Sequence, residues 1–251
     1  MAATFVATAI AQAPNPTPYE RAAALVARMT FQEQLGLLQG FKPTNTTEAY
    51  CGVVKGVPRL AVPDLKFSDG PEGYRTLDPY KRTSTQWPSG QTVARTFSVD
   101  SMRKYGEAMG QEFQKKGANV QFGPAVNVAR VPNAGRSFEY LSGEDPFLGY
   151  VLVQPLVEGI QGQGVIANVK HWILNDQEGF VTAGMSQPGA GDRHFTSSEI
   201  DEQTMMELYF PPFEGAIEAG VLSVMCANSE FRTCEARCVR AWPAGWSAVR
   251  A

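Results

Sequence analysis

The stretch "ANVKHWILNDQE" (residues 167–178) places Lys170 beside His171 at the end of an apolar run. His171 is one of only two histidines in the 251 residues. The overlapping segment "VIANVKHW" (165–172) has the character of a strand. A regular strand sends neighbouring side chains to opposite faces, so two donors that reach one ligand require the backbone to leave strand geometry here. The alternative is that Lys170 and His171 form a satisfied polar pair at a strand end.

Three further strand-like runs and three helical stretches surround this segment. The runs are "LKFSD" (65–69), "NVQFGPAVNV" (119–128) and "VLSVMCAN" (221–228), and the predicted helices extend from Ser98 towards Gly117, from Asp145-Pro146 onward, and from near Ser198 to a break at Pro211-Pro212. In the first helix the residues predicted to face inward are Met102, Tyr105, Met109 and Phe113. Strands separated by single helices predict βα units and a parallel sheet. No Gly-x-Gly-x-x-Gly turn follows a strand, which disfavours a nucleotide-binding doubly wound fold.

Polar residues gather just after the ends of these runs. They are Asp69, Asn127, Lys170-His171 and Asn228. In a (β/α) barrel this is the face on which sites are built. The sequence therefore predicts an α/β fold of the (β/α)8 TIM-barrel type.

The N-terminal region contains two helix starts. "TPYE" (17–20) and "TFQE" (30–33) are both capping boxes. Apolar residues at helical spacing predict one buried stripe in this region, formed by Ala22, Leu25, Val26 and Met29. The preceding "MAATFVATAIAQA" (1–13) indicates either a secretory signal or a disordered start over residues 1–16. A glycosylation acceptor pattern at Asn45 points in the direction of secretion.

Composition excludes several function classes. The net charge is −3, with no basic stripe upstream of the last twenty residues, which argues against a nucleic-acid partner. No run reaches the roughly 18 apolar residues that a membrane-spanning helix needs. Cys226, Cys234 and Cys238 are close together, but two distant histidines make a zinc site an unattractive interpretation. No metal or cofactor is predicted.

Two further segments bring charged groups to strand ends. "FSDGPEGYR" (67–75) carries Asp69 and Arg75, and "NAGRSFEYLSGEDP" (133–146) carries Arg136. Singly, each has a structural explanation: a turn-forming aspartate, a surface ion pair, or, for Asp145, a helix N-cap. Together with the Lys-His pair they suit a sugar, because carboxylates accept hydrogen bonds from hydroxyls while Arg and Lys donate to them.

At these residues the chain resembles glycoside hydrolase family 3, the β-glucosidase and β-xylosidase family. The family patterns "DGPxGxR", "GRNxExxSxDP" and "KHxxxNxQE" match or closely match Asp69 to Arg75, "GRSFEYLSGEDP" and "KHWILNDQE". The resemblance extends from about residue 18 to about residue 228 and includes "VMC" (224–226). It implies that the chain is the first half and more of a (β/α)8-type barrel, incomplete over residues 17–230. By resemblance, the residues that hold the sugar are Asp69, Arg75, Arg136, Lys170, His171 and Met225.

The chain departs from the family where the chemistry is expected. Relatives follow "VMC" with a Ser-Tyr-Asn-like stretch and, further on, a nucleophilic aspartate, but here no Tyr follows Tyr209 and no Asp follows Asp201. The family's acid/base residue usually comes from a second domain. Glu178 and Glu144 are the nearest substitutes by motif, and we expect both to be structural. No catalytic residue is therefore assigned.

The last residues, 231–251, form an atypical tail rich in Arg, Ala and Trp. The expectation is a C-terminal truncation, from a frameshift, an alternative splice or a shortened gene model. The resemblance implies a Cys226–Cys238 disulfide, whereas the family partner of Cys51 is replaced by Lys66.

The functional prediction is a secreted β-glucosidase-like hydrolase of O-glycosyl bonds, with a role in polysaccharide degradation. It would act by the retaining route on a β-glucoside or related oligosaccharide, without metal or cofactor, and would be inactive in this form. Two alternatives stay open: a sugar-binding partial barrel without chemistry, and a non-functional product whose open sheet edge is unstable.

Overall fold

The computed structural model describes residues 15–41, 50–76, 83–132, 134–177, 197–227 and 230–232. Its main sheet has six strands in the order β1-β2-β3-β4-β5-β7. Their bounds are β1 Gly40–Phe41, β2 Gly52–Val54, β3 Leu65–Asp69, β4 Val120–Phe122, β5 Ile166–Trp172 and β7 Ser223–Cys226. The pairs from β3 to β7 are parallel, whereas β1, β2 and β3 pair antiparallel. The four predicted strand-like runs thus contain neighbouring parallel strands, as expected.

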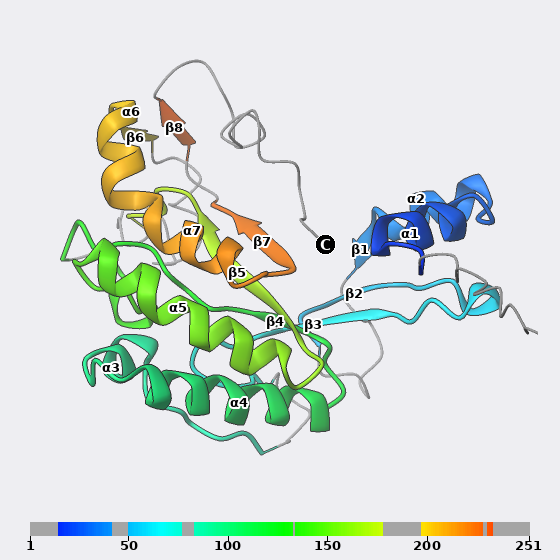
Figure 1. The fold of residues 1–251 in the computed structure, drawn as a ribbon, viewed down its shortest axis with the longest axis horizontal. Coiled ribbons are helices and arrows are strands. Elements are labelled where there is room, and N and C mark those ends of the chain that lie inside the picture. Colours follow the sequence, from blue (N-terminus) through cyan, green and yellow to red (C-terminus); the bar gives the residue numbers. More distant parts are fainter. Residues whose placement is uncertain are drawn as a thin grey trace, which may run out of the picture.

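Helices cover one face of the parallel strands (Figure 1). The described helices are α1 Pro18–Val26, α2 Phe31–Leu37, α3 Gly90–Ala94, α4 Val99–Lys115, α5 Pro146–Gln161, α6 Glu202–Thr204 and α7 Pro211–Glu218, with a π-helical turn over Met205–Tyr209 and short 3-10 turns at Pro58–Leu60 and Ser137–Glu139. Helix α5 packs between α4 and α7, and all three contact the sheet. The sheet and these helices form a curled part of a barrel wall, which confirms the predicted fold class.

The contact between α4 and α5 depends on glycine. A Cβ atom on Gly106 would lie 2.6 Å from the carbonyl oxygen of Leu156, and one on Gly159 would lie 2.6 Å from that of Arg103. Because real Cβ atoms do not approach a backbone oxygen so closely, a side chain at either position would push the helices apart. The four α4 residues predicted to face inward are all buried in this core: Met102, Tyr105, Met109 and Phe113.

Local signals at helix starts were predicted correctly. Both N-terminal capping boxes are present, with Thr17 and Thr30 each accepting from the glutamate N–H three residues on. Asp145 caps α5 by accepting from the backbone N–H groups of Phe147 and Leu148. These bonds satisfy donors that have no partner within the helix.

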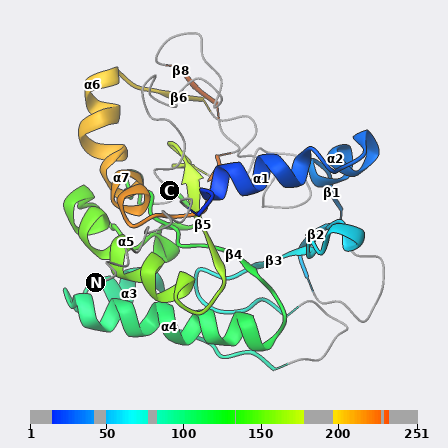
Figure 2. The same cartoon turned by 45° about the vertical axis from the view of Figure 1, so that its right-hand side comes forward.

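The buried stripe predicted for the N-terminal helix is wrong. No residue of α1 is buried and Val26 is 44% exposed, although Met29 just beyond the helix is buried. Figures 1 and 2 show α1 and α2 apart from α4 and α5. An amphipathic pattern shows which face of a helix can be buried, but it does not supply the surface that covers it.

Two predicted boundaries also differ from the structure. The run 119–128 is a strand only over Val120–Phe122, and beyond it Ala125 forms an isolated bridge with Lys170. The helical stretch predicted to break at Pro211-Pro212 does end just before them, at Tyr209, and α7 begins at the prolines. Its predicted start near Ser198 is wrong, because Ser197–Glu199 is a strand and α6 begins at Glu202. Proline fits the first turn because the N–H it lacks has no helical partner there.

A second, two-stranded sheet pairs β6 (Ser197–Glu199) with β8 (Glu230–Arg232) and lies near α6 (Figure 2). Several predictions lie outside the described residues: the segment 1–14, Asn45, Glu178, Asn228, Cys234, Cys238 and the tail from 233. Within the described part of the chain, no helix combines the length and apolarity that a membrane crossing requires.

Candidate sugar-binding site

The predicted site residues lie at the carboxyl ends of the parallel strands. Asp69 is the last residue of β3, and Lys170 lies near the end of β5. Met225 of β7 is half-buried and in register with Lys170. Since parallel strands end at the same edge of a sheet, one edge gathers these side chains from separate strands.

Lys170 is buried beside a carboxylate. Its side chain is 4% exposed, and its Nζ lies 3.6 Å from Oε2 of Glu139, whose side chain is 6% exposed. The Nε of Arg136 bonds to the other carboxylate oxygen of Glu139. Burial lowers the pKa of Lys170, while Glu139 and Asp69 oppose that change and Arg136 adds to it. One acidic group thus holds two cationic donors in place.

Asp69 and Arg75 form the second ion pair of the site. The loop after β3 returns so that Arg75 Nη1 lies 2.6 Å from Asp69 Oδ2, and the Arg75 N–H donates to the Asp69 carbonyl at 3.1 Å. The Asp69 side chain is 35% exposed and that of Arg75 is 61% exposed. The charge of Asp69 also acts on the buried Lys170. Asp69 is therefore an accessible acceptor in the same electrostatic environment as Lys170.

His171 is held by an amide and a phenol. Its backbone N–H donates to Asn127 Oδ1 at 2.7 Å, and Asn127 Nδ2 donates to the His171 carbonyl at 3.0 Å. The Tyr140 hydroxyl lies 3.1 Å from Nδ1 of the imidazole, and Asn175 Nδ2 donates to that hydroxyl at 3.0 Å. These contacts determine the direction of the ring.

The backbone leaves regular strand geometry at the Lys-His pair. The register of the pairing between β5 and β7 shifts between Lys170 and Trp172. This is the irregularity predicted for two neighbouring side chains that serve one site. Both side chains are buried, and Lys170 lies beside Glu139 while His171 contacts Tyr140, so these contacts also fit the alternative of a satisfied polar pair at a strand end.

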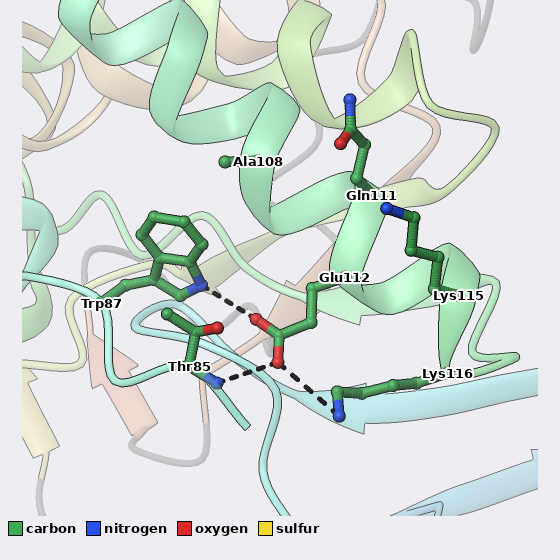
Figure 3. Close-up of a pocket in the computed structure, with 7 residues that line it drawn as sticks. All are labelled: Thr85, Trp87, Ala108, Gln111, Glu112, Lys115 and Lys116. Atoms are coloured by element: carbon green, nitrogen blue, oxygen red, sulfur yellow. Dashed lines mark hydrogen bonds and ion pairs between the residues drawn. The ribbon is translucent and has the colours of Figure 1, made fainter. Parts of the chain in front are cut away.

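The loop that carries Asp69 and Arg75 is fastened to α4 by the segment Thr83–Pro88. The Trp87 N–H donates to the Glu72 carbonyl at 3.3 Å, and the Tyr105 hydroxyl bonds to the Pro71 carbonyl at 3.0 Å. Glu112 of α4 holds the segment, since it accepts from the Thr85 N–H at 2.9 Å and from Trp87 Nε1 at 3.0 Å (Figure 3).

A hollow of about 510 Å³ lies along this fastening on α4 (Figure 3). Its lining residues are Thr85, Trp87, Ala108, Gln111, Glu112, Lys115 and Lys116. None of the predicted sugar-binding residues lines it. The Glu112 carboxylate at its centre is already bonded through both oxygens. We therefore interpret this hollow as a by-product of the fastening, separate from the candidate residues at the strand ends.

A half-buried carboxyl group, that of Asp176, lies next to the site in sequence. Burial raises the pKa of Asp176 to about 6 from its ordinary value of 3.8, and the charge of Arg130 only partly opposes this. Burial also raises the pKa of Tyr209, and Asp176 adds to that effect. The folded state therefore binds a proton at Asp176 more tightly than the unfolded state does. The stabilisation of the folded state by this proton is complete below about pH 4 and is lost as the pH rises through about 6.

Replacing Asp176 by Asn is expected to remove this loss. A difference of about two pKa units corresponds to about 3 kcal/mol, so Asp176→Asn should raise the free energy of unfolding by up to that amount at pH 7 and by little at pH 4. Urea titrations of both proteins at several pH values measure the difference. Asp100→Asn, at an exposed position, is the control. A stability difference that does not vary between pH 4 and pH 7 would contradict this account.

The site includes residues that the sequence did not assign to it. Glu139 was not assigned as the group that holds Arg136 and Lys170, and Tyr140 and Asn127 were not assigned to the orientation of His171. The spacing Arg136-x-x-Glu139, on one short turn, was the available signal for the ion pair. Nothing local to Tyr140 indicates a contact with a histidine 31 positions away.

Comparison with known proteins is consistent with this arrangement. Residues 39–248 match the model of the glycosyl hydrolase family 3 N terminal domain. The chain belongs to glycosyl hydrolase family 3. Its relatives in this family include a probable β-glucosidase A of Aspergillus terreus and β-glucosidase A of Aspergillus kawachii, each 40% identical over 215 residues. Either match covers 84% of this chain and 24% of the relative, so the chain spans about a quarter of the length of these relatives.

Solved family 3 structures share the fold. The β-glucosidase DesR from Streptomyces venezuelae, in complex with D-glucose, superimposes with a TM-score of 0.73 and 33% identity, over 84% of this chain and 25% of that one. The β-D-glucoside glucohydrolase of Trichoderma reesei gives a TM-score of 0.74 and 32% identity, over 88% of this chain and 29% of that one. The sheet described above is therefore part of a family 3 N-terminal barrel.

Proposed function

We propose that this chain carries the glucose-recognition residues of a family 3 β-glucosidase, which would bind the terminal, β-linked glucose of a glucoside or oligosaccharide. The observation that supports this most directly is the Arg136–Glu139–Lys170 network beside the Asp69–Arg75 pair at the strand ends. The identity to enzymes named β-glucosidases adds to it.

The chemistry of a pyranose matches this network. Each hydroxyl both donates and accepts, so recognition needs fixed donors and fixed acceptors close together. Lys170, Arg136 and His171 are candidate donors, and Asp69 is the accessible acceptor. Because Lys170 is buried and charge-paired, its ammonium group is already desolvated and oriented before the sugar arrives. Met225 would supply an apolar contact to the C–H face of the ring.

Hydrolysis with retention needs a nucleophilic carboxylate and an acid about 5 Å from it. Asp69 and Glu139 do not have these two roles in the structure. Asp69 is paired with Arg75, and Glu139 is paired with Arg136 and Lys170. This observation favours a second candidate function, a sugar-binding barrel segment without chemistry of its own. Recognition is common to both candidates.

We further propose that the barrel segment spans residues 17–230, with an N-terminal signal or disordered segment over 1–16 and an atypical tail over 231–251. The acceptor pattern at Asn45 and the Ala-rich first residues support secretion. Neither a cofactor nor a metal has a part in the proposed function.

The proposed function is tested by titrating the chain with D-glucose and, as the matched control, L-glucose in a calorimeter. The two sugars are chemically identical except for handedness, so a site built from fixed donors and acceptors should bind only the D form. Saturable heat with D-glucose alone is the expected result. Equal signals with both sugars, or no binding of either by the folded chain, would contradict the proposal.

A further inference from the structure

The hydroxyl of Tyr140 contacts two polar groups near the end of β5. It lies 3.1 Å from Nδ1 of His171, and Asn175 Nδ2 donates to it at 3.0 Å. All three side chains are buried, with exposed fractions of 3% for Tyr140, 4% for His171 and 2% for Asn175. Because buried polar groups are almost always hydrogen-bonded, the proton positions in this chain of contacts follow from which atoms can donate.

The backbone fixes both partners of the contact between Tyr140 and His171. The N–H of Leu141, directly after Tyr140, donates to the Ala125 carbonyl at 3.1 Å. Asn127 accepts from the backbone N–H of His171 at 2.7 Å and donates to its carbonyl at 3.0 Å. Ala125 and Asn127 belong to the same short segment after β4, so one piece of backbone places both the phenol and the imidazole.

The donors in this chain of contacts determine where the imidazole proton lies. An amide nitrogen can only donate, so the phenolic oxygen of Tyr140 is the acceptor in its bond with Asn175. The same hydroxyl has one proton to give, and Nδ1 of His171 lies within hydrogen-bond distance of it. A bond in that direction makes Nδ1 an acceptor, so a neutral imidazole then carries its proton on Nε2. In this arrangement each bond strengthens the next, since a hydroxyl that accepts one hydrogen bond donates more strongly in another.

We propose that Tyr140 is a positioning residue of the sugar site, whose hydroxyl donates to Nδ1 of His171 and so fixes the neutral imidazole with its proton on Nε2. This inference rests on the proposed sugar-binding function and adds to it a residue that acts through His171. In this tautomer Nε2 can donate to a sugar oxygen, whereas in the other tautomer it could only accept. The matched family pattern leaves position 140 open, so the resemblance did not indicate Tyr140.

The test is the protonation of each imidazole nitrogen, read from the nitrogen NMR shifts of histidine-labelled protein at about pH 8, where an ordinary histidine is neutral. The chain has two histidines, so a His194→Gln variant identifies the His171 signals. We expect wild type to show a protonated Nε2 and an unprotonated Nδ1 for His171. Tyr140→Phe removes only the hydroxyl, so it should give a mixture of the two tautomers. Calorimetry should show D-glucose binding that is about two- to tenfold weaker, as the loss of one hydrogen bond predicts.

Tyr150→Phe is the matched control. The Tyr150 hydroxyl bonds to Glu218 between α5 and α7, so its loss should change neither the His171 signals nor the affinity for D-glucose. The wild-type spectrum tests the proton assignment by itself, even where Tyr140→Phe does not fold.

Two results would overturn the inference. The first is a wild-type His171 with a proton on Nδ1, and the second is a folded Tyr140→Phe chain whose tautomer or D-glucose affinity equals that of wild type. In both cases the proposed function stands as long as wild type binds D-glucose. If wild type binds no D-glucose, the proposed function is wrong and the role of Tyr140 in sugar binding fails with it.

Discussion

Asp69→Ala is expected to remove most of the affinity of the chain for D-glucose. The Asp69 carboxylate is 35% exposed at the end of β3, so it can accept from sugar hydroxyls while Arg75 holds its other side at 2.6 Å. Each charged hydrogen bond contributes about 1.5–3 kcal/mol, so the loss of two should weaken binding at least about 100-fold. Calorimetric titration with D-glucose measures the change.

The matched control for this prediction is Asp100→Ala. Asp100 also pairs with a cation, Lys104 at 2.7 Å, but both side chains are more than 70% exposed on α4. Exposed pairs contribute little, so this variant should bind D-glucose as wild type does. Asp69→Asn keeps the shape of the side chain and should lie between wild type and Asp69→Ala. Equal affinity for wild type and Asp69→Ala would show that this carboxylate does not contact the sugar.

The parts of the fold that follow from local chemistry were predictable. Thr17 and Thr30 identify helix starts because their side chains satisfy N–H groups only three residues away. The alternation of apolar runs with helices indicates parallel strands, because two parallel strands must be joined by a crossover connection, which is usually a helix. The apolar stripe of α4 was predicted correctly, because α5 and the sheet pack against it and bury it.

Long-range features were not predictable in the same way. The N-terminal stripe has the same helical spacing as that of α4, yet Val26 is 44% exposed. The difference lies in what packs against each helix, which spacing does not encode. Likewise, Lys170 and Glu139 are 31 positions apart, and no local pattern shows that they meet at 3.6 Å. The motif resemblance identified Lys170 and Arg136, but only the structure shows the carboxylate between them.

Under the proposed function, recognition of the sugar is separate from the chemistry of hydrolysis. The candidate acceptors and donors arise at the ends of β3 and β5 and in the loop that precedes α5, and the loop after β3 is fastened to α4. These contacts depend on the parallel register from β3 to β7 alone. A sugar could therefore be held by this part of the barrel even where the reacting carboxylates are supplied by other residues. Binding and turnover must accordingly be measured independently.

We expect the 251-residue polypeptide to show no turnover of an aryl β-D-glucoside. The residues that follow Met225 include neither a tyrosine nor an aspartate, the two residue types that the family places around its nucleophile. Retaining hydrolysis requires one carboxylate to capture the oxocarbenium-like carbon and a second group to protonate the leaving oxygen. Among the described residues, Asp69 contacts Arg75, and Glu139 contacts Arg136 and Lys170, so both carboxyl groups are engaged in ion pairs instead of being placed to attack the sugar or to protonate the leaving oxygen.

A 4-nitrophenyl β-D-glucoside is the most demanding substrate for this prediction, because its activated leaving group needs little protonation and a lone nucleophile could suffice. Release of 4-nitrophenol is followed beside a complete family 3 β-glucosidase as the positive control, and D-glucose binding by the same preparation shows that the chain is folded. The expected rate equals that of buffer. Turnover that disappears in Glu178→Gln would overturn the prediction and identify a carboxylate that has taken over the reaction.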